Sequence, residues 1–287
     1  MKRKITLFSV VNTIILLGLV VVTLYPFVHM GAVSLSSSIH VLKGEVSWFP
    51  KGFQLETYKL VLSDPRIGKA YWNTIVYVTL GTVISLVITS LGAYALAKKT
   101  MLFHRGFTLV IIFTMFFSGG MIPTFLVVKE LGVMDTVWGI VLPGAVSTWN
   151  LLIMRTFFSG IPVELEESGR IDGLNDIGVF FRIVVPLSQA VFATIGLFYA
   201  VGLWNNFMLP LLYLRDPDLF PLQVILRNIV LAGQVNQADA AAIGDNVVLE
   251  ESLKYATIMV STVPILLIYP FLQKYFVKGV MIGAVKG

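Results

Sequence analysis

Six long apolar blocks with few charges constrain this 287-residue chain more than any other feature. A membrane-spanning helix needs about 20 mainly apolar residues, because the hydrocarbon core of a bilayer is about 30 Å thick. Here 56% of the residues are hydrophobic and 13% are charged, whereas a soluble domain carries about a quarter charged residues. The sequence therefore predicts an all-α integral membrane protein with six transmembrane helices, over residues 5–33, 71–97, 107–128, 137–158, 183–214 and 255–276.

Basic residues in the connections predict the direction of the chain, because Lys and Arg are retained on the cytoplasmic side. The basic triplet at residues 2–4 starts inside, and alternation then places both termini in the cytoplasm. The first block could also be a cleaved signal peptide, but its apolar stretch exceeds the roughly 7 to 15 residues of such signals. The expected outer loops cover residues 34–70, 129–136 and 215–254. We divide the chain into residues 1–70, the first span with its outer loop, and a five-span core over residues 71–287.

Several classes of protein are disfavoured by what the sequence lacks. No Asp, Glu, Lys or Arg lies in the middle of a span, which disfavours an ion-coupled carrier, since such charges mark ion relays. The net charge of +5 could suggest a nucleic-acid-binding protein. Many of the basic residues, however, lie at the ends of the apolar blocks, where membrane topology places them, and this disfavours a nucleic-acid-binding surface. The chain has no Cys, and His29, His40 and His104 stand far apart. We predict no catalytic residues, no bound cofactor and no metal site.

Residues 159–173 form a cytoplasmic connection that is too ordered for a simple link. Pro162 suits the first helical position, Glu164 lies in the first turn, where the helix dipole favours an anion, and Gly173 suits a left-handed C-terminal cap. The pattern predicts a helix at about residues 162–173. A solvated surface helix and a docking helix explain it equally well, although small residues would let another protein approach closely. The residues presented to the cytoplasm would be Glu167, Ser168, Gly169 and Asp172.

A second helix start follows at Asn175, a residue type that favours the N-cap position. Ile177, Phe180, Phe181 and Val184 then repeat at i, i+3, i+4 and i+7, which predicts one apolar stripe. We expect this stripe to lie along the membrane surface before Pro186 opens the fifth span.

The segment from residue 167 to residue 186 resembles the EAA motif of bacterial ABC importer permeases. Glu167 matches the acid of that motif, Gly173 its glycine, Ile183 its isoleucine and Pro186 its closing proline. The chain departs from the motif in three places, where Ser168 and Gly169 replace two alanines and Val185 replaces a leucine. Six spans with the motif between the fourth and fifth are similar to sugar permeases of the maltose-transporter (MalG-like) type. Residues 216–223 further resemble the LplC-like branch, which serves importers of complex oligosaccharides.

The resemblance implies a MetI-like, type I importer permease in the bacterial inner membrane that moves oligosaccharides by alternating access. It implies that residues 162–173 are a coupling helix, with Glu167, Ser168, Gly169, Asp172, Gly173 and Pro186 as the residues that couple to an ATPase. The implied partners are a second permease subunit, two cytoplasmic ATPase subunits that bind ATP and Mg, and an extracytoplasmic solute-binding protein. The chain itself has no phosphate-binding loop, since Gly68-Lys69-Ala70 lacks the first glycine and the hydroxyl of that motif.

Helix-loosening and polar residues within the spans suggest a transport pathway. Residues 118–120 precede Pro123, Pro143 and Gly144 are adjacent, and Pro210 lies in the fifth block; the backbone groups that such residues free need other partners. Ordinary helix packing explains each polar residue as well. The alternative functions are a permease for a peptide or amino acid, a secondary carrier or channel, and, least favoured, a membrane enzyme. The predicted pathway residues are Asn73, Asn150, Trp204, Asn205 and Asn206.

Overall fold

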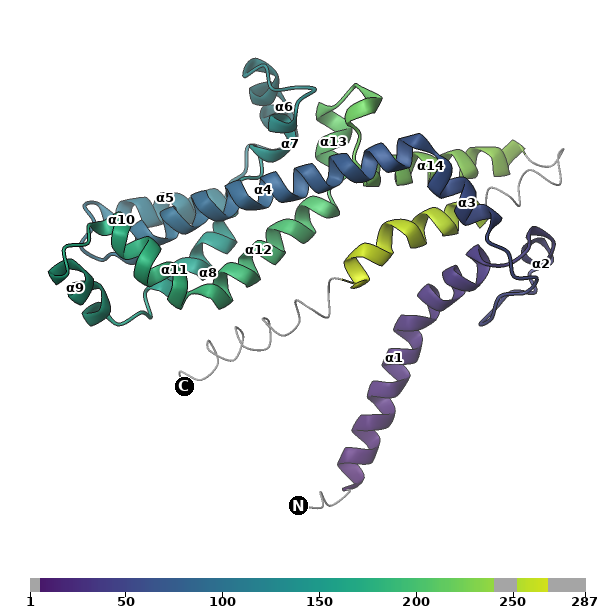
Figure 1. Ribbon diagram of the computed structural model, residues 1–287, viewed down its shortest axis with the longest axis horizontal. Coiled ribbons are helices and arrows are strands. Elements are labelled where there is room, and N and C mark those ends of the chain that lie inside the picture. The colour runs from purple at the N-terminus through teal and green to yellow at the C-terminus, as the bar shows by residue number, and fades with distance from the viewer. Residues whose placement is uncertain (1–5, 240–251, 268–287) are drawn as a thin grey trace. The chain divides into compact units, whose positions relative to one another are not determined.

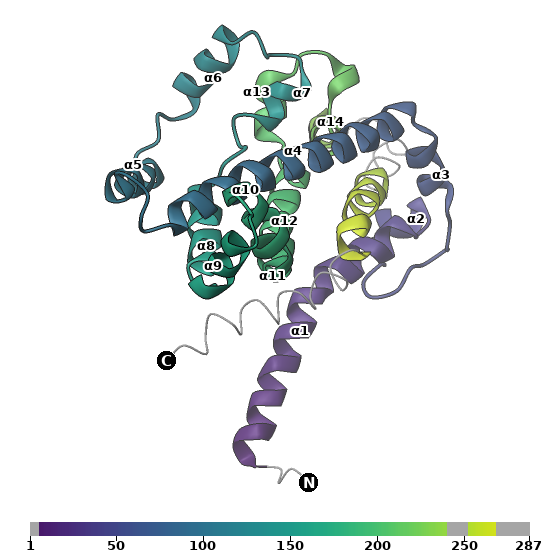
Figure 2. The same cartoon turned by 60° about the vertical axis from the view of Figure 1, so that its left-hand side comes forward.

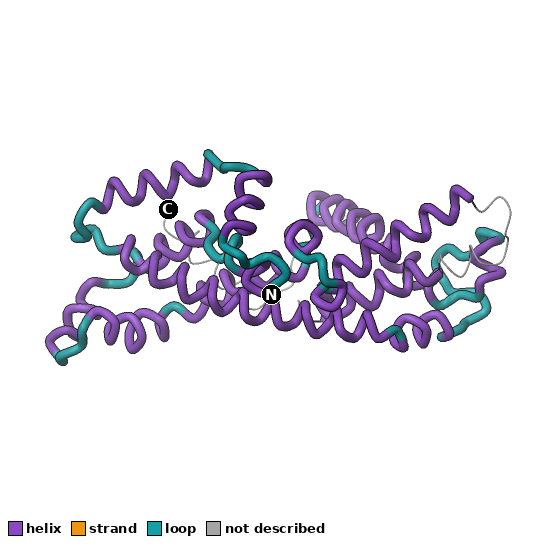
Figure 3. Tube along the Cα trace, turned by 90° about the horizontal axis from the view of Figure 1, so that it is seen from above, coloured by secondary structure: helices purple, strands orange, loops and turns teal. Residues whose placement is uncertain are grey.

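The computed structural model describes residues 6–239 and 252–267, and every regular element in these residues is a helix. Figure 3 shows the helices joined by loops, with no strand in the described part of the chain. The all-α prediction is therefore confirmed. Contacts divide the chain into two units, which we describe separately: unit 1 holds residues 1–68 and 225–264, and unit 2 holds residues 69–224 and 265–287. The division at residue 70 inferred above stays a prediction.

Unit 1 is built on one long helix, α1 (Leu7–Ser34), drawn in purple in Figure 1. The Thr6 hydroxyl caps α1 by accepting a hydrogen bond from the Ser9 N–H. Most of the apolar side chains of α1 are exposed, as lipid contact requires, and only its last turn is buried against Val46. Its 28 residues span about 42 Å, so the first predicted span is one helix. Two shorter helices follow in this unit, α2 (Ser38–Leu42) and α3 (Glu56–Ser63).

Unit 2 is organised along α4 (Pro65–Ala97), whose 33 residues make the second predicted span a single helix. In Figure 1, α9, α10 and α11 lie near one end of α4, whereas α6, α7 and α13 lie farther along it. Figure 2 shows the same two groups of short helices apart from each other. The other helices of unit 2 are α5 (His104–Phe116), α6 (Met121–Glu130), α7 (Val137–Val141), α8 (Thr148–Phe158), α9 (Val163–Ile171), α10 (Asp176–Val179), the π-helix η1 (Phe180–Val184), α11 (Val185–Leu187), α12 (Gln189–Trp204), α13 (Met208–Tyr213) and the 3₁₀-helix η2 (Pro217–Leu219). Two more helices, α14 (Leu222–Asp239) and one over Ser252–Leu267, belong mainly to unit 1.

Three predicted spans are not the continuous helices that we expected, and the helix-loosening residues account for two of the breaks. The span at 107–128 bends by 113° between α5 and α6, where Gly120 has a φ of 84° that favours glycine. The span at 137–158 is interrupted after α7, around Pro143 and Gly144. The span at 183–214 bends by 85° at Ser188 and breaks again after Trp204. A broken helix can still cross a membrane where its freed backbone groups are buried in protein or line a cavity.

Two further differences concern the ends of the predicted elements. The expected outer loop at 215–254 contains η2 and α14, so it is partly helical. The sixth predicted span, 255–276, is helical over its described part up to Leu267, and residues 268–276 lie outside the described residues.

Close approach of α4 and α12 holds the centre of unit 2 together. A Cβ added at Gly81 would lie 2.6 Å from Leu203 Cδ1, and one added at Gly196 would lie 3.2 Å from Leu86 Cδ1. Small residues at such crossings let helix backbones pack closely, which stabilises helix pairs in lipid. The main buried cluster lies between α4, α8, η1 and α12, and includes Met154, Val184 and Ile195. This packing fixes the helices that carry the two sites described below.

A clamp centred on Asp135 joins two loops of unit 2. Asp135 has a φ of 54°, which non-glycine residues rarely adopt, and its N–H donates to the Tyr213 carbonyl at 3.0 Å. Its carboxylate accepts hydrogen bonds from the backbone N–H groups of Arg215 and Asp216. These bonds, that from Arg215 foremost, hold the pKa of Asp135 below its ordinary value. The loop after α13 therefore depends on one ionised carboxylate.

Replacing Asp135 with glycine tests this clamp. Asp135→Gly suits the positive φ but removes the acceptor, so we expect tryptic cleavage after Arg215 in purified protein to quicken about fivefold. Asp135→Asn keeps an acceptor oxygen and should stay nearer the wild-type rate. Because the folded pKa is depressed, the carboxylate stabilises the loop above the unfolded value near 3.8 and loses that effect as pH falls through the folded value. A glycine variant as resistant as wild type would contradict the clamp.

Candidate functional site: a projecting helix and a cavity

The predicted cytoplasmic helix is present as α9. Pro162 has φ −57° and ψ 132°, which makes it the residue before the helix, one position earlier than expected. Glu164 and Glu166 lie in the first turn and Arg170 in the last, as the helix dipole favours. Gly173 has a φ of 84°, so the predicted left-handed position at the end of the helix is confirmed.

The predicted coupling residues do not all face the same way. Glu167, Ser168, Asp172 and Gly173 are exposed, and so is Pro186 in α11. Gly169 is buried, because its face of α9 packs on its own chain. A Cβ added there would lie 2.6 Å from Ile183 Cδ1 and 3.4 Å from Leu174 Cδ1. The small size of Gly169 thus serves packing within the chain, and our expectation that it is presented to the cytoplasm for a partner to approach was wrong.

Charged side chains fasten α9 to the rest of unit 2. Glu166 forms an ion pair with Lys98, one residue beyond the end of α4, and Arg170 Nη2 lies 2.6 Å from Asp176 Oδ1 at the start of α10. Burial, and then the neighbouring Arg170, lower the pKa of Lys98, while Asp176 opposes that shift. On α8, the Arg155 guanidinium donates to the Leu96 carbonyl at 3.1 Å. The helix α9 is therefore fixed to the end of α4, both directly and through α10.

The apolar stripe after Asn175 differs from the prediction. Asn175 caps α10 as expected, since its side chain accepts a hydrogen bond from the Gly178 N–H at 2.8 Å. Phe180 and Val184 are buried, but Ile177 and Phe181 are exposed. The π-helix η1 begins at Phe180, and its wider turn breaks the regular helical spacing that the prediction assumed. One stripe thus becomes two faces, one inside the chain and one outside it.

Exposed apolar side chains surround the polar surface of α9. Ile171 is 86% exposed, and apolar side chains that are exposed as a group mark interaction sites or lipid contacts. Val163, Ile177 and Phe181 are exposed as well. We define the α9 surface as these three residues and Ile171, together with the exposed polar residues Glu167 and Ser168.

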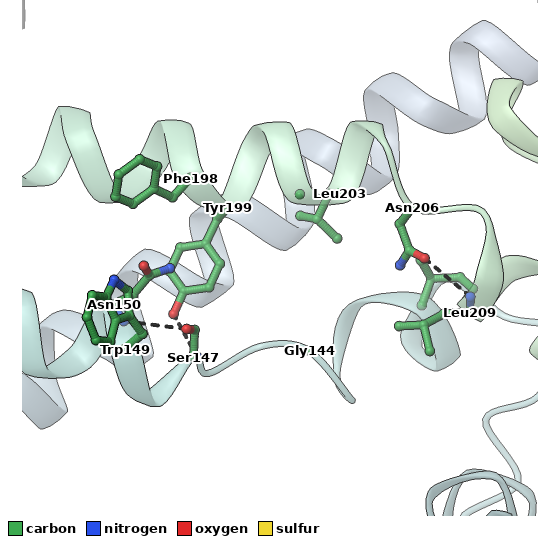
Figure 4. A pocket seen from close by; sticks show the side chains of 11 residues that line it. Gly144, Ser147, Trp149, Asn150, Phe198, Tyr199, Leu203, Asn206 and Leu209 are labelled. Atoms are coloured by element: carbon green, nitrogen blue, oxygen red, sulfur yellow. Dashed lines mark hydrogen bonds between the residues drawn. The ribbon is translucent and has the colours of Figure 1, made fainter. Parts of the chain in front are cut away.

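A second site lies where the fourth and fifth predicted spans are broken. It is a cavity of 530 Å³, within the usual range of about 300 to 1,000 Å³ for ligand sites. Figure 4 shows its wall, to which α7, the start of α8, the second half of α12, the start of α13 and the loops between them contribute. The lining residues are Ile140, Gly144, Ser147, Trp149, Asn150, Phe198, Tyr199, Gly202, Leu203, Asn206 and Leu209.

Hydrogen bonds fix part of the polar wall of this cavity. The Tyr199 hydroxyl lies 2.7 Å from Thr89 Oγ1 and accepts a bond from the Ser147 N–H at 2.9 Å. Asn206 Oδ1 accepts the Leu209 N–H at 3.2 Å. The Asn150 side chain, by contrast, has no hydrogen-bond partner among the residues that the structure describes, although Asn150 is only 6% exposed.

The predicted pathway residues separate into two groups. Asn150 and Asn206 come together in the cavity wall, whereas Asn73, Trp204 and Asn205 are not among its lining residues. The Asn73 amide donates to the carbonyls of Asp218 and Phe220, at 2.8 and 3.1 Å, and so holds the loop before α14. The Asn205 amide bonds to Val201 in its own helix. The Trp204 ring lies 6.4 Å from that of Tyr71.

Sequence reasoning missed the aromatic part of the cavity wall, Trp149, Phe198 and Tyr199. Trp149 follows soon after the Pro143 and Gly144 break and is adjacent to Asn150. The one available signal was this closeness of an aromatic residue to a predicted break. Phe198 and Tyr199 lie inside an uninterrupted apolar run and give no such signal.

Comparison with known proteins gives consistent matches over almost the whole chain. Residues 2–282 match the family described as the binding-protein-dependent transport system inner membrane component. The polygalacturonan/rhamnogalacturonan transport system permease protein YtcP of Bacillus subtilis is 42% identical, with all of both chains covered. Protein LplC of the same organism is 43% identical over 98% of this chain and 95% of its own. A chain from the crystal structure of a bacterial ABC transporter involved in the import of the acidic polysaccharide alginate is 35% identical, with a TM-score of 0.88 over 96% of this chain and 99% of that one.

The buried position of Gly169 gives a prediction about stability. Gly169→Leu should destabilise the packing of α9 by about 1 to 3 kcal/mol, because Ile183 and Leu174 must move. The matched variant Ser168→Leu, on the exposed side, should change stability by less than about 0.5 kcal/mol. Thermal unfolding of the two purified proteins in detergent compares them. Equal melting temperatures would contradict the assigned packing of Gly169.

The ion pair between Lys98 and Glu166 gives a second prediction. Lys98→Glu and Glu166→Lys each place like charges together and should lower stability by about 1 to 3 kcal/mol, since the pair is partly buried. The double exchange restores opposite charges and should recover much of the loss. A double-mutant cycle on melting temperature measures this coupling. Strictly additive effects would show that the pair does not hold α9.

Proposed function

Because the chain belongs to the family of inner-membrane components of binding-protein-dependent transport systems, we propose that α9 is its coupling helix and docks on a cytoplasmic ATPase. The chain is a multi-pass membrane permease subunit, and ATP hydrolysis belongs to the ATPase partner. The observation that carries the proposal is the α9 surface: polar and large apolar side chains of α9, α10 and η1 are exposed there, while ion pairs attach α9 to Lys98 and to α10.

The cargo that we propose is an oligosaccharide or a polysaccharide fragment. Two relatives support this: one is named for polygalacturonan and rhamnogalacturonan transport, and the other belongs to an importer of alginate. Sugars are held by stacking on aromatic faces and by hydrogen bonds, and the cavity offers Trp149 and Phe198 beside Asn150 and Asn206. We propose these four residues as the part of the pathway that this chain contributes.

The transporter works with ATPase subunits and a solute-binding protein, as its family implies. We propose that it pairs with a second, different permease subunit, that two ATPase subunits bind ATP and Mg, and that both chain termini are cytoplasmic. The basic residues in the inner connections support that direction.

The proposed mechanism is alternating access driven by closure of the ATPase. A ligand shifts such an equilibrium only as far as it prefers one state, so ATP must favour the outward-open state through the subunit that binds it. Closure would move α9, and the Lys98–Glu166 pair and the packing of Gly169 would carry that motion to α4 and η1. In this proposal α9 acts as a rigid lever. One face of the helix is fixed to its own chain through Glu166 and Gly169, and the exposed face is free to contact the ATPase.

Crosslinking from α9 tests the proposal, and the absence of Cys from the chain makes single labels clean. Ser168→Cys in the complete transporter, labelled with a maleimide that carries a photoreactive benzophenone, should crosslink to the ATPase subunit on illumination, and ATP should change the yield. Lys129→Cys is exposed in the connection predicted on the opposite side of the membrane and is the matched control. Mass spectrometry identifies the crosslinked protein. Crosslinks from Ser168→Cys to lipid or solvent alone, or an ATPase crosslink from Lys129→Cys, would refute the docking surface.

A further inference from the structure

In unit 1, the segment that follows α2 turns back along α1 (Figure 1). Val46 is buried against the last turn of α1. The next residue, Ser47, accepts a hydrogen bond at its carbonyl from His29 Nδ1, at 3.0 Å. The ring of the third residue, Trp48, has its centre 4.7 Å from that of Tyr25. Three successive residues therefore contact α1 at points that lie progressively farther from its end.

Hydrogen bonds close this segment at its other end. The Ser37 N–H donates to the Lys51 carbonyl at 3.0 Å, and the Lys51 N–H donates to the Ser36 hydroxyl at 3.0 Å. Both serines follow the end of α1 directly. We call residues 45–51 the return segment: the chain leaves the end of α1, passes back along the helix and comes out again.

The position of Tyr25 in α1 gives the depth that the return segment reaches. Tyr25 lies 18 residues after Leu7, which is about 27 Å along the helix and close to the roughly 30 Å thickness of the hydrocarbon core. The basic triplet at residues 2–4 precedes that stretch, and the last exposed large apolar side chain of α1 is that of Val28. The rings of Tyr25 and Trp48 thus lie at the far boundary of the hydrocarbon, where Tyr and Trp are enriched in membrane proteins.

The side chains at the bend of the return segment are apolar and exposed. Trp48 is 47% exposed and Phe49 is 81% exposed, and no Asp, Glu, Lys or Arg occurs from Val46 to Pro50. Apolar side chains that are exposed as a group mark interaction sites or lipid contacts. The contact with Tyr25 makes this surface continuous with the exposed apolar surface of α1, and that continuity favours lipid over a protein partner.

We infer that Trp48 and Phe49 insert into the outer leaflet of the bilayer at the level of the headgroups, and that the return segment anchors the end of α1 there. The bond from His29 satisfies the Ser47 carbonyl at a depth where water is scarce. The inference goes beyond the proposed coupling and cargo. It rests on the proposed direction of the chain only for the side of the bilayer, because the depth is counted along α1 itself.

A nitroxide label on Phe49→Cys tests the anchor, and the chain has no other Cys. The complete transporter, with no reactive Cys in its other subunits, is placed in nanodiscs of phosphatidylethanolamine and phosphatidylglycerol. Electron paramagnetic resonance with power saturation then measures how often the label collides with O2, which concentrates in hydrocarbon, and with the polar chelate Ni-EDDA, which stays in water. Leu17→Cys, at an exposed position in the middle of α1, is the lipid reference.

The matched control is Phe53→Cys, which replaces another exposed phenylalanine of the same loop. Its neighbour Gln54 donates from its N–H to the Leu35 carbonyl at 2.9 Å. Leu35 lies ten residues beyond Tyr25, about 15 Å farther along the direction of α1. Phe53 is therefore held on the water side of the boundary.

The ratio of O2 to Ni-EDDA collisions should be at least about threefold higher at Phe49→Cys than at Phe53→Cys, because polar solutes are excluded from apolar surroundings. It should stay below the ratio at Leu17→Cys, since the headgroup level is shallower than the middle of the span. Trp48→Cys, labelled in the same way, should also exceed Phe53→Cys, which keeps the test independent of one substitution.

Three results would overturn the inference. Equal ratios at Phe49→Cys and Phe53→Cys would place the return segment in water. A Phe49→Cys label that neither agent reaches would mean that another subunit covers it, and a label immobilised only after the solute-binding protein is added would identify that protein as the occupant. ATP-dependent uptake of oligosaccharide by the same labelled transporter tests the proposed function separately, since Phe49 belongs neither to the α9 surface nor to the cavity lining.

Discussion

The satisfaction of backbone hydrogen bonds inside the bilayer is the constraint on which the rest of this structure depends. A lipid-facing segment has no water to bond to, so irregular backbone is tolerated only where protein buries it or where it lines a cavity. The chain contains such backbone at residues 142–147 and 205–207, between α7 and α8 and between α12 and α13. Residues at both breaks, Gly144, Ser147 and Asn206, line one cavity. The site at which the helices are interrupted is therefore also the site that can accommodate a polar cargo.

A second constraint of the bilayer, the cost of charged side chains in hydrocarbon, explains why α9 lies outside the apolar part of the chain. Its first turn contains Glu164 and Glu166, and its last turn contains Arg170. Such charges are costly in hydrocarbon, so the helix stays in water. It is held against the end of α4 through Lys98 and against η1 through the space left by Gly169. This attachment leaves Glu167, Ser168 and Ile171 of α9 exposed.

The sequence predicted features whose cause is local, and it failed where the cause lies in tertiary contacts. The bounds of α9 follow from Pro162 and Gly173, which flank its two ends, and the cap at Asn175 is equally local. The burial of Gly169 depends on Ile183 and Leu174 in the following segment, so its small size alone suggested a partner surface instead. The predicted apolar stripe assumed regular α-helical spacing, and the π-helix that begins at Phe180 changes that spacing.

The predicted spans and pathway residues repeat this division. Pro143, Gly144 and Gly120 were recognisable as helix-loosening residues, yet apolar composition favoured continuous helices across them. Composition measures whether a segment prefers lipid, but it does not determine whether the helix is straight. Asn73 and Asn150 are chemically identical, and only the fold separates them, since one amide bonds to loop carbonyls while the other lines the cavity unbonded.

The two sites are connected by the helices that the breaks define. Helix α8 starts at the cavity and ends at Phe158, just before the connection to α9, and its 11 residues span about 16 Å. Helix α12 starts beside α11 and ends at the cavity. The two helices pack together through the cluster that contains Met154 and Ile195, and close-packed interiors transmit displacement rather than absorb it. A shift of α9 therefore has a short, rigid route to the wall that holds Asn150.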